Sequence, residues 1–455
     1  MAYNFKECNR DQVFLLPPSI REWLPEGDLA LFIIDAVAQM DLGAFYRKYR
    51  PDGRGQAAFE PSMMTTLLLY AYSVGIRSSR QIERLCERDI AFKVIAANQV
   101  PDHCTIARFR QENGKEIGGL FTEVLKLCAK AGLVKVGVVA LDGTKVKANA
   151  ALEANRTYEH IKREVSKMLT EAETTDAEED KLYGKAKRGD ELPDDLRDPE
   201  SRLRRLQECK KRLEEEAGAE AEEQRAKIKE RRAEEIETGQ KKRGRKPNEP
   251  DPKPPADAKA NTTDPDSRIM KTRSGYVQGY NGQAVVTKGQ VIVAAELTPQ
   301  ENDIRQLHPM VEKAQENITA LKIEEEIEVV LADAGYCSDA NLEKMDPQGP
   351  EHLIATQKDW KQRQAQASAP PPRGRIPNDL SDRERMERKL RTKRGRALYK
   401  KRSQIVEPVF GQIKAARGIT AFMRRGFDAC AQEWKLICAT HNLLKLWRSG
   451  QAVAC

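Results

Sequence analysis

The chain has 455 residues, which is enough for two or three domains with their own hydrophobic cores. Its 78 basic and 70 acidic side chains leave a formal net charge of +8, a balance that permits a polyanionic partner without requiring one. The longest charge-free apolar stretch, residues 63–76, is too short to span a bilayer, so we expect no membrane association.

The cysteines and the N-terminal residues bear on the compartment. None of the nine cysteines form a CxxC pair, so the sequence suggests neither a zinc module nor a disulfide framework. The first residues contain no apolar core of the length found in signal peptides. We therefore expect a cytoplasmic protein whose reduced thiols fill its core.

Residues 1–133 predict an all-helical domain. Apolar residues recur at three- and four-residue steps between residues 29 and 40, and a second helix begins at Pro61 and ends near Gly75. Two shorter helices follow, one opening near Ser79 and one near Asp102, and both carry arginines.

These two shorter helices resemble a helix-turn-helix, which would make residues 1–133 a DNA-binding domain. Four arginines would then face phosphates or base edges: Arg80, Arg84, Arg108 and Arg110. A helical bundle with ordinary surface arginines explains the same local pattern equally well.

Residues 136–141 form an apolar run without helical spacing, which is typical of a fully buried strand. Asp142 stands at its last position and Gly143 follows. A buried carboxylate without a partner costs several kcal/mol. Asp142 therefore either caps a turn with Gly143 or faces a functional site, and taken alone the turn is the simpler interpretation.

Residues 153–267 read as an insertion after this strand. From residue 199 to about 235 the composition is dominated by Glu, Lys, Arg and Ala, which favours one long, charged, solvent-exposed helix. An apolar seam at Leu203, Leu206 and Leu213 is too short to predict a coiled coil.

A basic run at residues 241–247 follows the expected long helix. Its Arg243 and Arg245 are suited to an A·T minor groove, although any basic linker binds phosphate non-specifically. Residues 248–267 are rich in proline and predict a loose linker.

From residue 268 the pattern again predicts a sheet. A hairpin turns at Lys288-Gly289, a helix covers residues 302–315, and a buried strand at 327–332 runs directly into Asp333. A short helix from residue 338 and a last strand at 353–355 complete a mixed α/β sheet with helices on it. Because sites gather at strand ends in such sheets, and paired carboxylates bind Mg²⁺ well, two strands that end in Asp favour a site.

The remaining residues are basic and then helical. Residues 359–396 are polar and rich in Lys and Arg, and a helix over 399–414 carries an apolar stripe at Ile405, Val409 and Ile413. Glu407 and Lys414, seven residues apart, share another face of that helix. A final amphipathic helix covers residues 428–447.

Asp142, Asp333 and Glu407 resemble the three acids of DDE-type bacterial insertion-sequence transposases. Tyr399, Arg402, Glu407 and Lys414 are similar to the Tyr-Arg-Glu-Lys signature of one subgroup, although the Arg402-to-Glu407 spacing is one residue longer than in that pattern. The resemblance implies an RNase H-like fold with a mixed five-stranded sheet flanked by helices. Residues 134–152 and 268–455 would form this catalytic domain, interrupted by the insertion.

The resemblance also implies an activity. Asp142, Asp333 and Glu407 would hold two Mg²⁺ or Mn²⁺ ions for cleavage and strand transfer of double-stranded DNA, with terminal inverted repeats and target DNA as partners. Tyr399, Arg402 and Lys414 would contact the DNA near the cut, in a homodimer assembled on paired ends in the nucleoid. Two alternatives remain open here: a nuclease of the same fold that joins no strands, and a non-catalytic DNA-binding regulator.

The extra residue before Glu407 yields a local prediction. Five steps along an α-helix rotate about 500°, which places Arg402 and Glu407 on different faces. Pro408 lacks an N–H group, so it opens a new helix or kinks an existing one. We expect a π-bulge just before Pro408 to restore a shared face.

Overall fold

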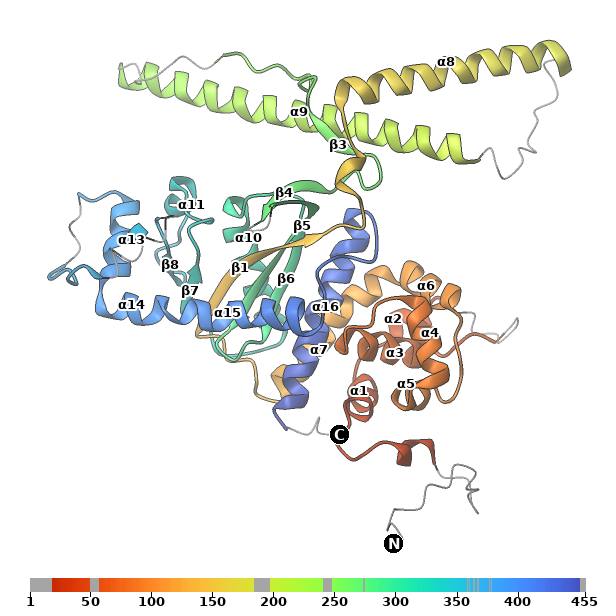
Figure 1. Cartoon of the computed structure of the whole chain (residues 1–455). Helices are drawn as coiled ribbons and strands as arrows, with labels where there is room; N and C mark the ends of the chain where they lie inside the picture. Colours follow the sequence, from red (N-terminus) through yellow and green to blue (C-terminus); the bar gives the residue numbers. More distant parts are fainter. Residues whose placement is uncertain are drawn as a thin grey trace, which may run out of the picture.

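The computed structural model describes residues 19–49, 57–183, 197–239, 248–272 and 275–450, apart from scattered positions between 358 and 378. The fold has three parts: a helical head, a mixed sheet covered by helices, and an arm of two long helices that projects from the sheet (Figure 1).

The head is entirely helical in its described residues, as the sequence predicts. Several of its helices start at side chains that accept hydrogen bonds from the first turn, for example Asp28 and Asp102. The elements are η1 (Ile20–Trp23), α1 (Leu29–Val37), α2 (Gly43–Tyr46), α3 (Pro61–Ser73), α4 (Ser79–Arg88), α5 (Ile90–Ile95), α6 (His103–Glu112) and α7 (Gly114–Lys130).

The sheet is mixed, with one long antiparallel hairpin and two parallel pairings. Its strands are β1 (Val138–Lys147), β4 (Arg268–Thr272), β5 (Gly275–Thr287), β6 (Ile292–Thr298), β7 (Val329–Ala332) and β8 (Glu351–Ile354). β5 lies antiparallel to β1, β4 and β6, whereas β1 and β8 both lie parallel to β7. The five predicted strands are all present.

The prediction of five strands nevertheless needs one correction, because β4 makes the sheet six-stranded. β5 has 13 residues and its partner β6 only seven, so the first residues of β5 extend past the end of β6. β4 pairs with residues 275–279 of β5 and satisfies the backbone groups that β6 leaves open.

Helices cover the sheet and connect it to the head. They are η4 (Ile304–Gln306), α10 (Leu307–Ala320), α11 (Asp339–Glu343), α13 (Asp382–Arg391), α14 (Lys393–Tyr399), α15 (Lys401–Gly411), the π-helical turn η5 (Gln412–Ala416) and α16 (Phe427–Arg448). α15 runs against β1, and α16 packs against β6 on one side and α7 and α3 on the other (Figure 1).

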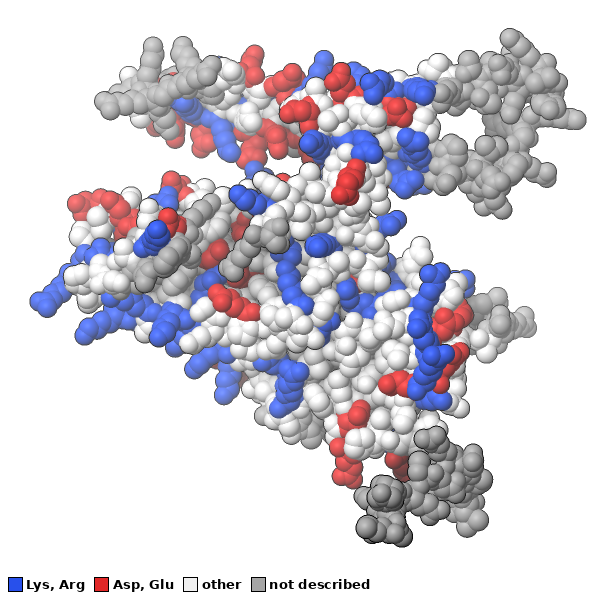
Figure 2. All heavy atoms as spheres, viewed as in Figure 1, with Lys and Arg blue, Asp and Glu red and all other residues white. Residues whose placement is uncertain are grey.

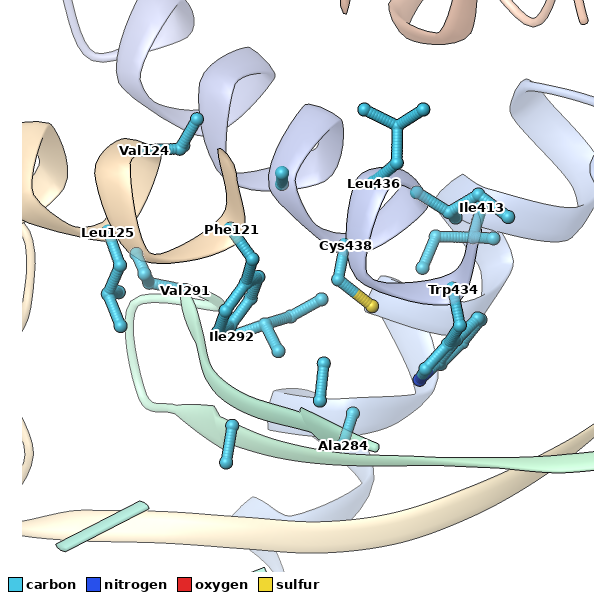
Figure 3. Packing of buried hydrophobic residues seen from close by; sticks show 14 of the residues in the cluster. Phe121, Val124, Leu125, Ala284, Val291, Ile292, Ile413, Trp434, Leu436 and Cys438 are labelled. Carbon is cyan, nitrogen blue, oxygen red and sulfur yellow. The ribbon is translucent and has the colours of Figure 1, made fainter. Parts of the chain in front are cut away.

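The head and the sheet share one buried apolar cluster, and α16 stands in its middle. Figure 3 shows Phe121 of α7 and Ile292 of β6 next to each other on one side of Cys438, and Trp434 on its other side. The Trp434 indole donates to the carbonyl oxygen of Gln283 at 3.1 Å. The expected role of cysteines in the core is confirmed for Cys86, Cys128, Cys209, Cys430 and Cys438, which are buried.

The arm consists of two long helices, α8 (Tyr158–Tyr183) and α9 (Arg197–Thr238). It is connected to the sheet by the short turn η2 (Leu152–Ala154) and by a two-stranded ribbon of β2 (Asn155–Thr157) and β3 (Lys259–Asn261). Figure 2 shows acidic and basic side chains intermixed along it, and ion pairs four residues apart, such as Arg204 with Glu208, line α9. The predicted charged helix is therefore present.

The predicted apolar seam of the arm is also used, over a short stretch. Leu206 and Leu213 of α9 are buried against Ile161 and Val165 of α8, in a small cluster separate from the main core. Two ion pairs connect α9 to β4 and to η4, Glu216 with Arg268 and Glu223 with Arg305. No helix in the described part of the chain is both long and apolar enough to cross a bilayer.

Candidate active site

Asp142 lies inside β1 and not at its end, so the expectation that the strand ends at this acid is wrong, and of the two interpretations of Asp142 the turn with Gly143 is excluded. The parallel pairing with β7 stops at Leu141 and Ala332, but the antiparallel pairing with β5 continues through Asp142 and Gly143 to Lys147. The long partner β5 supplies backbone hydrogen bonds well beyond the point where β7 ends. Asp142 is therefore the first residue of β1 after the pairing with β7 ends.

Asp333 follows the last residue of β7, as the sequence predicts. Because Leu141 is paired with Ala332, the next residues, Asp142 and Asp333, lie side by side where the pairing of the two parallel strands ends. Local backbone amides hold both carboxylates: Gly143 N donates to Asp142 at 2.8 Å, and Gly335 N donates to Asp333 at 2.7 Å.

Glu407 comes to these two acids on α15, and the guanidinium of Arg402 lies between all three. Arg402 Nη2 is 2.7 Å from Asp142 Oδ2 and 3.9 Å from Asp333 Oδ2, and its Nη1 is 4.0 Å from Glu407 Oε1. The Arg402 side chain is only 12% exposed, whereas that of Glu407 is 64% exposed. The three predicted acids thus come from three elements and surround one cation.

The π-bulge that the sequence predicts before Pro408 is absent. α15 is α-helical from Lys401 to Gly411 with Pro408 inside it, and the π-helical turn η5 comes afterwards. Pro408 cannot donate to the carbonyl oxygen of Gln404, which instead accepts a hydrogen bond from the Gln290 side chain at 3.2 Å. The helix keeps its regular phase here, and the Arg402 guanidinium reaches Glu407 because the Arg402 side chain is long.

Burial and like charges perturb the site. Burial, assisted by the nearby carboxylates of Asp333 and Asp303, raises the pKa of Asp142 to about 7 against the opposing effects of Arg402 and the Gly143 amide. Burial alone would lower the pKa of Arg402, but the surrounding carboxylates, Asp142 first, outweigh it and raise that pKa. A raised pKa for one of the acids is the effect expected from their mutual repulsion.

Tyr399 and Lys414 flank the acids. The Tyr399 hydroxyl lies 3.3 Å from the carbonyl oxygen of Ala332, the residue before Asp333. Lys414, within η5, donates to the carbonyl oxygen of Lys145 on β1 at 2.6 Å. The structure therefore places Tyr399, Arg402, Glu407 and Lys414 beside the ends of β1 and β7.

Sequence reasoning missed Asp303, which precedes η4. Its carboxylate lies next to the site. The side-chain amides of two β5 residues, Asn281 and Gln283, donate hydrogen bonds to it at 2.7 Å each. No strand or helix pattern marks an acid in this connection, so only the folded sheet identifies it.

The donor set suits a hard divalent cation, because carboxylate and amide oxygens are the preferred ligands of Mg²⁺ and Mn²⁺. The Oδ1 atom of Asn281 is buried there and has no hydrogen-bond partner within the described part of the chain. In those residues no three side chains of the metal-binding types converge as a ready-made metal site. Arg402 holds the central position instead.

The head arginines differ in their surroundings. Arg80, Arg84 and Arg108 are exposed on α4 and α6. Arg110 instead points inward, where it donates to the carbonyl oxygen of Arg77 at 2.8 Å and to the Tyr72 hydroxyl at 3.3 Å. Arg243 and Arg245 lie outside the described residues.

Comparison with protein families matches two parts of the chain. Residues 252–443, which include Asp333 and Glu407, match the family described as the transposase DDE domain, so this part of the chain belongs to the DDE class of DNA-processing enzymes. Residues 18–112 match a second family, the transposase domain DUF772. The chain is thus a DDE-type insertion-sequence transposase. Neither the curated proteins nor the solved structures include a match.

Two features lie outside what these matches establish. β1, with Asp142, precedes the matched DDE range and is separated from it by the arm. The matches do not reach the subgroup, so the assignment to the Tyr-Arg-Glu-Lys signature remains a prediction. DNA is the partner that the families imply, and divalent metal ions are their usual cofactors.

Proposed function

We propose that Asp142, Asp333 and Glu407 are the catalytic acids and together hold two Mg²⁺ or Mn²⁺ ions during DNA cleavage and strand transfer at the ends of the insertion sequence. The observation that carries this proposal is the convergence of the three acids around the Arg402 guanidinium. The Arg402 guanidinium already balances their charges. Asp142 and Asp333 are far apart in the sequence, but they follow paired residues of neighbouring strands in the sheet.

When bound, the two ions would activate a water molecule or a 3′-hydroxyl and stabilise the leaving oxygen in an in-line attack on a phosphodiester. Asp142 and Asp333 are fixed by the amides of Gly143 and Gly335, so their positions are set before any ligand arrives. Glu407 is the most exposed of the three, and a rotation of its side chain brings it to the other two.

Arg402 would exchange one oxyanion for another. In its resting position it binds carboxylates, and the same planar guanidinium can bind two oxygens of a DNA phosphate. Tyr399 and Lys414 flank it and would hold the strand on either side of the cut. Lys393 and Lys400 of the neighbouring α14 region are exposed, and basic side chains gather along this edge in Figure 2, which supports a DNA path there.

The head would recognise the terminal inverted repeats through Arg80, Arg84 and Arg108, which are exposed and can reach DNA. Arg110 would contribute indirectly, because it ties α6 to the end of α3. Two copies of the chain would assemble on paired ends and then engage target DNA. With these partners the protein would act at the nucleoid, in the bacterial cytoplasm.

The decisive experiment compares the wild type with Asp142→Asn on a duplex that carries the element's ends. The variant should bind this duplex normally but lose Mg²⁺-dependent cleavage by several orders of magnitude, because the carboxylate is removed while the fold is kept. A variant that still cuts would refute the assignment of Asp142. Joining of cleaved ends to a second duplex distinguishes a transposase reaction from simple nuclease cleavage.

A further inference from the structure

A fourth carboxylate lies beside the three predicted acids and is held in an unusual way. Asp303 sits between β6 and η4, and its side chain is 22% exposed. Its Oδ1 atom accepts hydrogen bonds from both Asn281 Nδ2 and Gln283 Nε2, at 2.7 Å each. These amides are two residues apart on β5, hence on the same face of the sheet, and both residues are fully buried.

Two glycines make room for this carboxylate. A Cβ atom on Gly143, the residue after Asp142, would lie 2.6 Å from Asp303 Oδ1. A Cβ atom on Gly335 would lie 3.2 Å from Asp303 Oδ2 and 2.9 Å from Asp333 Oδ1. Neither glycine has a positive φ, so the lack of space for a side chain, and not the backbone conformation, explains why glycine occupies these positions. The absence of these two side chains lets Asp303 approach both predicted catalytic aspartates.

The two oxygens of Asp303 have different surroundings. Oδ1 takes both amide donors, and the Lys145 ammonium is 4.0 Å from it. No donor in the described part of the chain is hydrogen-bonded to Oδ2, and this oxygen and Asp333 Oδ1 both lie beside Gly335, within 3.2 and 2.9 Å of the position that a Cβ atom would take there. Like charges brought together in a partly buried space repel unless a cation lies between them. A carboxylate fixed by one oxygen, with its other oxygen turned toward a second carboxylate, is suited to bind a cation.

We propose that Asp303 is a fourth acidic residue of the active site and binds, through Oδ2, the divalent cations held by Asp142 and Asp333. This inference rests on the proposed metal site and adds a ligand to it. Asn281 and Gln283 act as positioning residues, because they fix the Asp303 carboxylate without facing the ions. Gly143 and Gly335 keep the approach open.

The test is a Mn²⁺ titration of the full-length protein without DNA, followed by calorimetry. Asp303→Asn keeps an oxygen that accepts from both amides and replaces only Oδ2 and its charge. We expect Mn²⁺ affinity to fall about 10- to 100-fold, the usual range when a metal ligand's surroundings are altered. Asp303→Ser, which also retains an oxygen, provides a second variant in case the first does not fold.

Two controls separate the possible failures. Glu301→Gln removes the same charge from an exposed side chain two residues away, and should change the affinity less than about twofold. Asp142→Asn should weaken Mn²⁺ binding at least as much as Asp303→Asn does. If Asp142→Asn binds Mn²⁺ as tightly as the wild type, the proposed metal site itself is wrong. If Asp142→Asn loses binding while Asp303→Asn and Asp303→Ser match Glu301→Gln, the site stands and the role of Asp303 is refuted.

A purely structural role for Asp303 predicts a different result in the absence of metal. If the carboxylate only connects β5 to η4, Asp303→Asn should lower the melting temperature in EDTA. If it serves as a metal ligand, removal of its charge relieves repulsion, so the melting temperature in EDTA should stay the same or rise. The Mn²⁺-induced increase in melting temperature should then shrink.

Discussion

Charged side chains meet in two contrasting settings in this transposase, the active site and the arm. In the active site the guanidinium of Arg402 is 12% exposed and serves three carboxylates. On the arm, Arg204 and Glu208 form a one-to-one pair with side chains 82% and 53% exposed. The residue types are the same, but water screens the second pair and is largely excluded from the first.

The difference shows where charge matters for this fold. Ion pairs four residues apart on α9 each support the helix by a few tenths of a kcal/mol, and many of them make a long exposed helix possible. In the candidate active site, the register of β1 and β7 brings Asp142 and Asp333 together. Arg402 balances their repulsion in this structure, and metal ions would balance it in the mechanism that we propose.

The largest expected effect comes from removing the central cation. Arg402→Gln should lower the free energy of unfolding by about 3 kcal/mol in EDTA at pH 8, because it leaves Asp142 buried without its partner. The matched change on the arm, Arg204→Gln, should alter stability by less than about 0.5 kcal/mol. Urea unfolding of both variants measures the contrast, and similar losses in the two would contradict it.

A smaller effect is expected from pH. The pKa of Asp142 is about 7 in the folded protein and ordinarily 3.8, so between these values the folded state binds the proton more tightly. This group therefore favours folding at low pH, and its contribution is lost as the pH rises through about 7. In EDTA, the difference in unfolding free energy between wild type and Asp142→Asn should change by roughly 2 kcal/mol between pH 5 and pH 8.

The histidines act in the opposite direction and cancel in that comparison. Burial lowers the pKa of His352 to about 4 and of His441 to about 3, so their contribution to stability is present above pH 6.5 and declines as the pH falls. Both residues are the same in the wild type and in Asp142→Asn. A difference between the two proteins that does not vary with pH would show that Asp142 titrates normally.

The last two expected effects come from glycines and differ in sign, and the effect at Gly218 is the smallest. A Cβ on Gly143 would lie 2.4 Å from Gln283 Nε2, so Gly143→Ala should destabilise the protein by about 1–3 kcal/mol. Gly218 lies within α9 with no atom in reach of an added Cβ, so Gly218→Ala should stabilise the arm by about 0.5–1 kcal/mol. Urea unfolding followed by circular dichroism measures both, and a destabilising Gly218→Ala would contradict the open setting.

Much of the fold could be predicted from local patterns. The apolar runs before Asp142 and Asp333, the hairpin at Lys288-Gly289 and the charged helix of the arm are all present. In each of these elements the side chains alone determine the preference, because the period of apolar residues matches one secondary structure. β4 has no such pattern, and it forms because the start of β5 needs a partner.

The candidate site could be predicted in part. The three acids and their elements follow from the sequence, but the position of Asp142 within β1 depends on how far β5 extends. Arg402 reaches the acids through the length of its side chain, against what helical geometry alone suggests. Arg110 is typical of a DNA contact in sequence, yet its hydrogen bonds are internal.

The sequence by itself determined most of the strands and helices and pointed to the three acids that we propose as catalytic, because these depend on short-range periodicity and residue chemistry. Only the tertiary structure decided which charges meet. Asp303 became a candidate ligand because β5 fixes one of its oxygens and two glycines leave space for it beside Asp142 and Asp333. Contacts of this kind between charged groups depend on strand register and on the space between elements, and neither is encoded in any single stretch of the chain.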